Sequence, residues 1–274
     1  MLPDRLAISI LLIPVAAWVV ASGGPVFLLM LVVMFVIAAR EYIRMFSASQ
    51  RPARWLIIVG APLLVAARAF PILLTSGGLL TALILAALVW HLVDFERGAP
   101  ASATDFVVSL GGILYLGWLG GFFFDIRHLP DGLWWTLMTL GALWSSDTGA
   151  YAVGRALGRR KLSPRLSPKK TWEGFAGGIV VGALCSALLA PFWQIGAGPN
   201  SLVSWQTGLL IGAIVGLVGP LGDLGISMLK RQTGVKDAGD LIAGHGGVLD
   251  RIDSWLVAIP VCFYTIRLMQ LLTR

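Results

Sequence analysis

The sequence predicts an all-α integral membrane protein with about nine transmembrane helices. Hydrophobic residues make up 57% of the 274 positions and charged residues only 13%, and the mean hydropathy is +0.83. A soluble globule of this size needs more charged residues to cover its surface. Apolar runs of about 20 residues, the length that a bilayer core requires, also recur along the whole chain.

Nine apolar segments are long enough to span a bilayer, and each is expected to form a helix. They lie at residues 6–22, 26–46, 55–73, 78–95, 105–125, 132–153, 173–193, 205–228 and 249–271. The first segment follows Arg5 and partly resembles a signal peptide. Its apolar run continues through Val20, however, and a second segment follows at once, so we expect the first to be retained. Cys185 and Cys262 lie within apolar runs, where packing is the expected role.

The distribution of basic residues predicts the orientation of these helices. With the N-terminus in the cytoplasm, the cytoplasmic side holds all but four of the 21 lysines and arginines, the exceptions being Arg127, Arg267, Arg274 and Arg68. Because cytoplasmic loops are enriched in Lys and Arg, we expect a multi-pass protein of the cell (inner) membrane, with the N-terminus inside and the C-terminus outside. Arg68 lies within a span, where it either snorkels or pairs with a carboxylate, or else holds a lipid phosphate.

Ionisable residues are concentrated near the C-terminus, between two apolar segments. Residues 219–253 contain five aspartates, two lysines and two arginines, and such groups beside lipid-length runs are costly and usually functional. Asp250 and Asp253 are three residues apart and share one face of a helix. Asp223 can join them from the preceding helix, which we expect to break at Gly219-Pro220. Three converging carboxylates predict a site for a hard divalent cation.

A second basic region lies between residues 155 and 171 and is the most basic loop of the chain. All five lysines of the protein fall between Lys161 and Lys236, and lysine is well suited to phosphate. The loop leads into a helix near Trp172, so backbone N–H groups and lysines can meet a polyphosphate together. Alternatively, such a loop only fixes topology or attracts anionic lipid. Asp147, near this loop, either pairs with Arg155 or belongs to the site.

Two blocks of residues in these regions have a long and specific spacing. The first is Ser146-Asp147-Thr148-Gly149-Ala150-Tyr151, followed by Ser167-Pro168-Lys169-Lys170-Thr171-Trp172-Glu173-Gly174. The second is Ser227-x-x-Lys230-Arg231 and Lys236-Asp237, followed by His245-Gly246-Gly247 and Asp250-Arg251-x-Asp253. Together they resemble the signature of the phosphatidate cytidylyltransferases, the CDP-diacylglycerol synthases. The resemblance covers about residues 144–253, and the N-terminal half is similar to the family only in being hydrophobic.

The resemblance implies transfer of CMP from CTP to phosphatidic acid, with release of pyrophosphate and with Mg²⁺ as cofactor, a second cation being left open. The implied catalytic residues are Asp223, Asp250, Asp253, Lys230, Arg231 and His245, of which the three aspartates would hold the metal. The implied substrate-binding residues are Asp147, Ser167, Lys169, Lys170, Thr171, Ser227, Lys236, Asp237, Gly246, Gly247 and Arg251. His245 acts either as a base or only as a hydrogen-bonding side chain of its turn.

Other functions are also compatible with parts of the sequence. A CTP-dependent polyprenol or lipid kinase would release CDP instead of pyrophosphate. An ion-coupled transporter also uses intramembrane aspartates, but the halves show no inverted repeat. A structural scaffold would not need three converging aspartates. The expected partners are CTP, phosphatidic acid and the bilayer, with no nucleic acid.

The sequence also suggests a division of labour along the chain. Residues 1–140 are expected to form structural, lipid-facing helices, and residues 141–274 a catalytic region with cytoplasmic basic loops. Small residues repeat on one helix face at Gly117 and Gly121, at Gly178 and Gly182, and at Gly208, Gly212 and Gly216. Such faces allow close helix packing, either within the monomer or in a homodimer.

Overall fold

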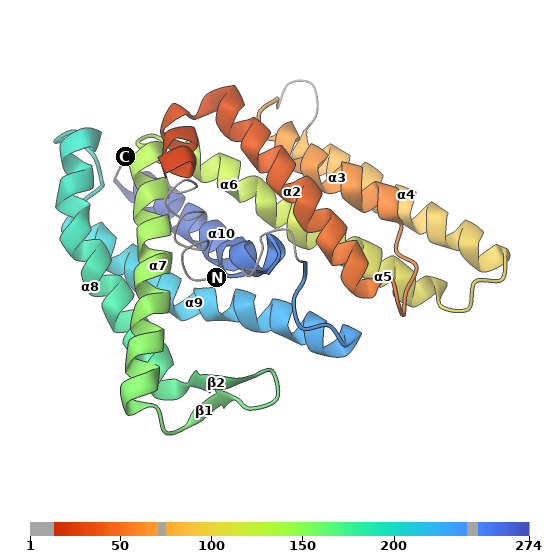
Figure 1. The fold of residues 1–274 in the computed structure, drawn as a ribbon. Coiled ribbons are helices and arrows are strands. Elements are labelled where there is room, and N and C mark those ends of the chain that lie inside the picture. Colours follow the sequence, from red (N-terminus) through yellow and green to blue (C-terminus); the bar gives the residue numbers. More distant parts are fainter. Residues whose placement is uncertain (1–13, 71–74, 240–245, 274) are drawn as a thin grey trace. The chain divides into compact units, whose positions relative to one another are not determined.

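The structure is a computed structural model that describes residues 14–70, 75–239 and 246–273. Over this part of the chain it is all-α apart from one small hairpin, and residues 14–22 form the first helical stretch. The remaining helices are α2 (Gly24–Phe46), α3 (Arg54–Ala67), α4 (Ser76–Glu96), α5 (Ser102–Gly112), α6 (Leu119–Arg127), α7 (Gly132–Leu157), α8 (Trp172–Ala197), α9 (Trp205–Thr233) and α10 (Leu249–Leu272) (Figure 1). A π-helical segment, η1 (Ile113–Trp118), joins α5 to α6.

The prediction of a polytopic all-α membrane protein is confirmed. Among the described residues, six continuous helices are long and apolar enough to cross a bilayer, namely α2, α4, the rod from Ser102 to Arg127, α8, α9 and α10. Each of the nine predicted segments contains a helix over its described residues. The helices begin where local chemistry favours them: Pro25 lies in the first turn of α2, and Thr75 accepts a hydrogen bond from the Gly78 N–H to cap α4. The count of nine complete spans stays a prediction.

Two local features differ from the expectation. The basic loop contains an antiparallel hairpin of β1 (Lys161–Ser163) and β2 (Ser167–Thr171). Since both of its strands are edge strands, Pro168 can sit in β2 without breaking a ladder. The predicted helix break at Gly219-Pro220 is wrong, because α9 runs through Pro220 to Thr233. Proline lacks an N–H group but is tolerated in membrane helices, where neighbouring groups satisfy the freed carbonyl.

By compactness the chain divides into two units, each described here by itself. The first consists of Met1–Asp125 and Thr233–Arg251, and the second of Ile126–Gln232 and Ile252–Arg274. The predicted division into a structural region, residues 1–140, and a catalytic region, residues 141–274, is a division by function. It stays a prediction.

In the first unit, α3 packs against α2, α4, α5 and η1. The helices touch where side chains are small: a Cβ on Gly117 would lie 2.9 Å from the Ala61 Cα. Arg68 pairs with Asp125, with 2.8 Å between Nη1 and Oδ2, and its guanidinium lies 4.5 Å from the Trp118 ring centroid. Of the two roles left open for Arg68, pairing with a carboxylate is therefore the one observed.

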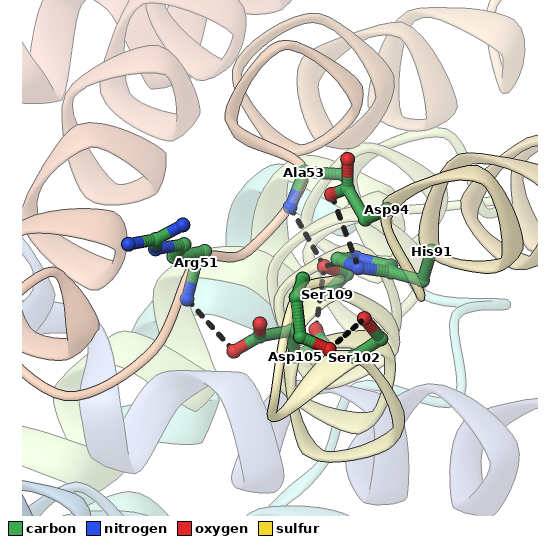
Figure 2. Close-up of polar contacts among 8 residues, drawn as sticks. Arg51, Ala53, His91, Asp94, Ser102, Asp105 and Ser109 are labelled. Atoms are coloured by element: carbon green, nitrogen blue, oxygen red, sulfur yellow. Dashed lines mark hydrogen bonds and ion pairs between the residues drawn. The ribbon is translucent and has the colours of Figure 1, made fainter. Parts of the chain in front are cut away.

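A buried polar cluster joins α4, α5 and the start of α3 within this unit (Figure 2). Ser109 Oγ accepts a hydrogen bond from the Ala53 N–H at 2.8 Å and donates to the Asp105 carbonyl at 2.8 Å. His91 Nε2 lies 2.9 Å from the same hydroxyl. Since the hydroxyl proton is already used, His91 donates this bond through its Nε2–H. The Asp105 carboxylate accepts from the Arg51 N–H at 2.7 Å.

In the second unit, α7 and α8 lie side by side and the hairpin connects their ends (Figure 1). Glycines bring the backbones together: a Cβ on Gly178 would lie 3.0 Å from the Ser146 carbonyl oxygen, and one on Gly212 would approach the Gly182 carbonyl. A Cβ on Gly216 would lie 2.6 Å from the Ile179 Cα. The small-residue faces of α8 and α9 therefore pack within the chain.

Candidate active site

A cavity of about 450 Å³ lies within the second unit, lined by residues of α7, the hairpin, α8 and α9. The charged side chains that line it are four basic ones and one acid, namely Arg155, Lys161, Lys169, Lys170 and Asp147. Concentrated positive charge of this kind favours a polyanionic ligand. The residues implied by the family resemblance that line this cavity are Asp147, Lys169, Lys170 and Thr171.

The hairpin holds its lysines in place through both of its ends. Lys161 pairs with Thr171 in the ladder, and the Trp172 N–H donates to the Arg160 carbonyl at 2.9 Å. The carboxylate of Glu173 accepts from the backbone N–H groups of Arg159 and Arg160 at distances of 3.0 to 3.3 Å. The basic strand pair is thereby fixed to the first turn of α8.

The N-terminus of α8 opens onto the cavity. Thr171 caps this helix, because its Oγ1 accepts the Gly174 N–H at 3.1 Å, and both residues line the cavity. A helix N-terminus carries a partial positive charge and unpaired N–H groups, which favour phosphate. Ser167 lies at the other end of β2, opposite Ser163, and is not among the residues that line the cavity.

A chain of charged groups extends from the cavity across α9 to α10, within the second unit. The ammonium of Lys170 forms an ion pair with the Asp223 carboxylate, and Asp223 interacts directly with the side chain of Asp253. Asp147 interacts electrostatically with both Lys170 and Asp223. Arg155, the alternative partner proposed for Asp147, donates to the Tyr151 hydroxyl at 3.1 Å. Asp147 therefore belongs with the acidic residues around Lys170.

The structure brings together two of the three predicted metal ligands. Asp223 and Asp253 interact, and repulsion between two such carboxylates is relieved when a cation lies beside them. Asp250 Oδ2 accepts from the backbone N–H groups of Ala238 at 2.9 Å and Gly247 at 3.1 Å. Within residues 14–70, 75–239 and 246–273, no group of three or more His, Cys, Asp or Glu side chains is placed to hold a metal ion. The role of Asp250 as a metal ligand stays a prediction.

The remaining predicted residues lie on two other segments. Ser227, Lys230 and Arg231 are in the last turns of α9, where positive charge is favoured by the helix dipole. The others lie between α9 and the first turn of α10: Lys236, Asp237, Gly246, Gly247 and Arg251. Gly246 has a φ of 78°, a conformation that favours glycine. His245 lies outside the described residues.

Two cavity residues were missed as individual members of the site. Arg155 and Lys161 line the cavity beside Lys169 and Lys170, but the sequence showed only that they belong to a basic loop. Glu173 was also missed as the residue that anchors the hairpin. Its signal was an acid in the first turn of a helix directly after a run of basic residues.

A basic cavity beside a helix N-terminus, in a protein of apolar helices, is suited to bind a phosphate compound at a membrane. The chain belongs to the cytidylyltransferase family, whose model matches residues 3–269, and it is accordingly a nucleotidyltransferase. The resemblance predicted from the two motif blocks is confirmed.

Similarity to individual proteins supports the same family. The chain is 33% identical, over an alignment of 300 positions, to a phosphatidate cytidylyltransferase of Synechocystis sp., and the match covers 97% of each chain. It is 42% identical over 158 residues to a protein of that name from Bacillus subtilis, covering 57% of this chain and 56% of the relative. A Haemophilus influenzae protein of the same name is 46% identical over 141 residues, covering 50% and 47%. The first match spans essentially the whole chain, and the other two about half of it.

Proposed function

We propose that this protein transfers CMP from CTP to phosphatidic acid, forming CDP-diacylglycerol and releasing pyrophosphate. The observation that carries the proposal is the cavity that gathers Arg155, Lys161, Lys169 and Lys170 next to the N-terminus of α8. It occurs in a chain that is similar over 97% of its length to a protein named phosphatidate cytidylyltransferase.

The reaction joins two anions, so it depends on charge neutralisation and alignment more than on a nucleophilic side chain. A phosphate oxygen of phosphatidic acid attacks the α-phosphorus of CTP, and the bond from that phosphorus to the bridging oxygen of the β-phosphate breaks. Pyrophosphate leaves with that bond's electron pair. In this proposal Lys169, Lys170 and the backbone N–H groups at the start of α8 hold the triphosphate. Lys230, Arg231 and Lys236 would add positive charge around the leaving group.

Mg²⁺ fits the acidic side of the site. Asp223 and Asp253 present neighbouring carboxylates, and the ammonium of Lys170 already neutralises one of them. These two aspartates would hold the ion, with Asp250 as a further ligand. When bound, Mg²⁺ would neutralise charge that develops on the phosphate oxygens. Lys170 is paired with a carboxylate and lines the cavity, so it can exchange this partner for a phosphate.

The lipid tails would remain in the bilayer while the head group reacts at the cytoplasmic boundary. Large apolar side chains point outward from α8, where Leu188 is 71% and Ile195 82% exposed, as expected of a lipid-facing helix. We propose the orientation given by the basic residues, with N-terminus inside, nine spans and both motif blocks in the cytoplasm. A homodimer is compatible with this proposal.

One assay tests the reaction. Purified protein with phosphatidic acid, labelled CTP and Mg²⁺ should yield lipid-linked CMP and pyrophosphate in equal amounts. Release of CDP together with a phosphorylated lipid acceptor would contradict the proposal and support a CTP-dependent lipid kinase.

A second measurement tests the orientation. Single cysteines introduced next to Lys169 and next to Lys236 should both react with membrane-impermeant reagents only after the cytoplasmic face is opened. Labelling of the two positions from opposite sides would exclude one site built from both motif blocks.

A further inference from the structure

Glu41 is a buried acid in a helix that is otherwise suited to the bilayer. It lies in α2 and is only 7% exposed, and α2 is one of the helices apolar enough to span a membrane. A carboxylate in such a place is costly unless it is fully hydrogen-bonded. The reason for its presence should therefore be found in what it contacts.

Glu41 caps the N-terminus of α10, a helix more than 200 residues further along the chain. Its Oε1 accepts from the Val248 N–H at 3.0 Å and its Oε2 from the Leu249 N–H at 2.7 Å. Leu249 is the first residue of α10, and the first N–H groups of a helix have no partner within it. A carboxylate at this end is also favoured by the helix dipole. These residues all belong to the first unit.

Two glycines leave the space that this carboxylate fills. A Cβ on Gly239 would lie 2.5 Å from Glu41 Oε1, and one on Gly247 would lie 2.5 Å from Oε2. Neither glycine has a positive φ, unlike Gly246 at 78°. The missing side chains thus serve the close approach of Glu41 and are not needed for the backbone conformation.

Asp250 also holds this turn. Its Oδ2 accepts from the backbone N–H groups of Ala238 and Gly247. The segment from Gly247 to Leu249 is therefore fixed by two carboxylates, one from α10 itself and one from α2. Of these two carboxylates, only Asp250 belongs to a sequence motif, and Glu41 does not.

We propose that Glu41 is a positioning residue for the transfer reaction: it fixes the turn that starts α10, and thereby the first-turn residues Asp250 and Arg251. Asp253 follows three residues after Asp250 on the same helix. Glu41 itself touches no substrate. The inference rests on the proposed function. It gives Glu41 a part in the reaction, although Glu41 lies in residues 1–140, the region expected to be structural.

The first test replaces the carboxylate without changing its size. In Glu41→Gln, one acceptor oxygen becomes an NH₂ group that faces a backbone donor, so one of the two bonds to the turn is lost. We expect kcat to fall at least about tenfold, equivalent to about 1.4 kcal/mol in the barrier. The KM for CTP should change less than about threefold, because the cavity lies within the other unit. Glu41→Asp should recover part of kcat, since it keeps two acceptor oxygens.

Asp105→Asn is the matched control. Asp105 is another buried carboxylate of the first unit, 3% exposed, and it accepts from the backbone N–H of Arg51, which is not part of the turn (Figure 2). Its kcat should stay within about twofold of wild type. A Glu41→Gln enzyme with unchanged kcat would overturn the proposal, as would an equal loss in both variants. Equal losses would mean that Glu41 acts only through general stability.

A thermal measurement tests the cap without relying on activity. Gly239→Ala should lower the Tm, because its Cβ collides with the Glu41 carboxylate. In a Glu41→Ala background the same change should cost little, so the two substitutions should be strongly non-additive. Additive shifts in Tm would overturn the placement of Glu41, even if Glu41→Gln proved too unstable to assay. A wild-type protein that forms no lipid-linked CMP would instead overturn the proposed function, while the Tm values still report on the cap.

Discussion

Two polar regions of this molecule differ in how far their side chains are exposed. In the first unit, the cluster around His91, Asp105 and Ser109 is enclosed: these side chains are at most 3% exposed, and three of the bonds join side chains to the backbone. In the second unit, the side chains of Lys170 and Asp223 are 32% and 30% exposed, and Lys170 lines a cavity.

The difference teaches how to separate support from chemistry in a membrane protein. An enclosed polar group that is hydrogen-bonded to the backbone, as Asp105 and Ser109 are, stabilises helix packing and is not open to a ligand. Where charges of both signs crowd beside a cavity, their partners can be exchanged for those of a substrate. An enclosed ionisable residue can therefore act on a substrate only through the residues that it positions, whereas one beside a cavity can contact the substrate directly.

The largest effect should come from Asp223, which pairs with Lys170, and from its neighbour Asp253. Asp223→Asn and Asp253→Asn should each lower kcat by about a hundredfold or more, since electrostatic groups at a reacting phosphate are worth that much or more. EDTA should abolish activity and Mg²⁺ should restore it. The check is steady-state turnover of folded protein, with Tm measured in parallel. Full activity of Asp223→Asn would remove this residue from the site and break the comparison.

An intermediate effect is expected from the lysines of the hairpin. Replacing Lys169 and Lys170 together by glutamine removes charged contacts to phosphate worth about 1.5–3 kcal/mol each. The affinity for CTP should fall at least about tenfold, with the KM for phosphatidic acid little changed. Each substrate is varied separately, at low and at moderate salt. Weakened lipid affinity with unchanged CTP dependence would mean that the hairpin only attracts anionic lipid.

The smallest effect on the reaction is expected in the enclosed cluster. Ser109→Ala leaves the buried Ala53 N–H without its acceptor, which costs about 1–3 kcal/mol of stability. The Tm should drop by a few degrees, while kcat per folded molecule stays at the wild-type value. Thermal unfolding in detergent and the CTP assay measure the two quantities. A large loss of kcat at unchanged Tm would show that the enclosed cluster also takes part in the chemistry.

Features set by short stretches of sequence could be predicted, and features set by distant contacts could not. Hydrophobic length locates α2, α4, α8, α9 and α10, because a bilayer imposes that length on any helix that crosses it. Charge and spacing likewise indicated Lys169, Lys170 and Asp147, which line the cavity. Lys169 and Lys170 directly precede the N-terminus of α8, and Asp147 lies in the helix before it, α7.

The errors and omissions have a common physical origin. Proline at position 220 suggested a break, but packing keeps α9 helical through it. The short strands of the hairpin depend on pairing between Lys161 and Thr171, which neither residue reveals alone. Glu41 acts through backbone N–H groups more than 200 residues away. Because every residue except proline has a backbone N–H, the residue types at 248 and 249 do not reveal that these donors bind Glu41.

Pro220 affects the cavity through the hydrogen bonding of the main chain. Because proline has no N–H, the carbonyl of Gly216 lacks the donor that a regular helix would supply one turn later, and both residues line the cavity. This oxygen belongs to the main chain, so replacing the other side chains of the cavity by alanine would leave it in place. Pro220→Ala would supply the missing donor and so restore the hydrogen bond within the helix. The hydrogen-bonding capacity of the cavity wall thus depends partly on a backbone N–H that proline lacks.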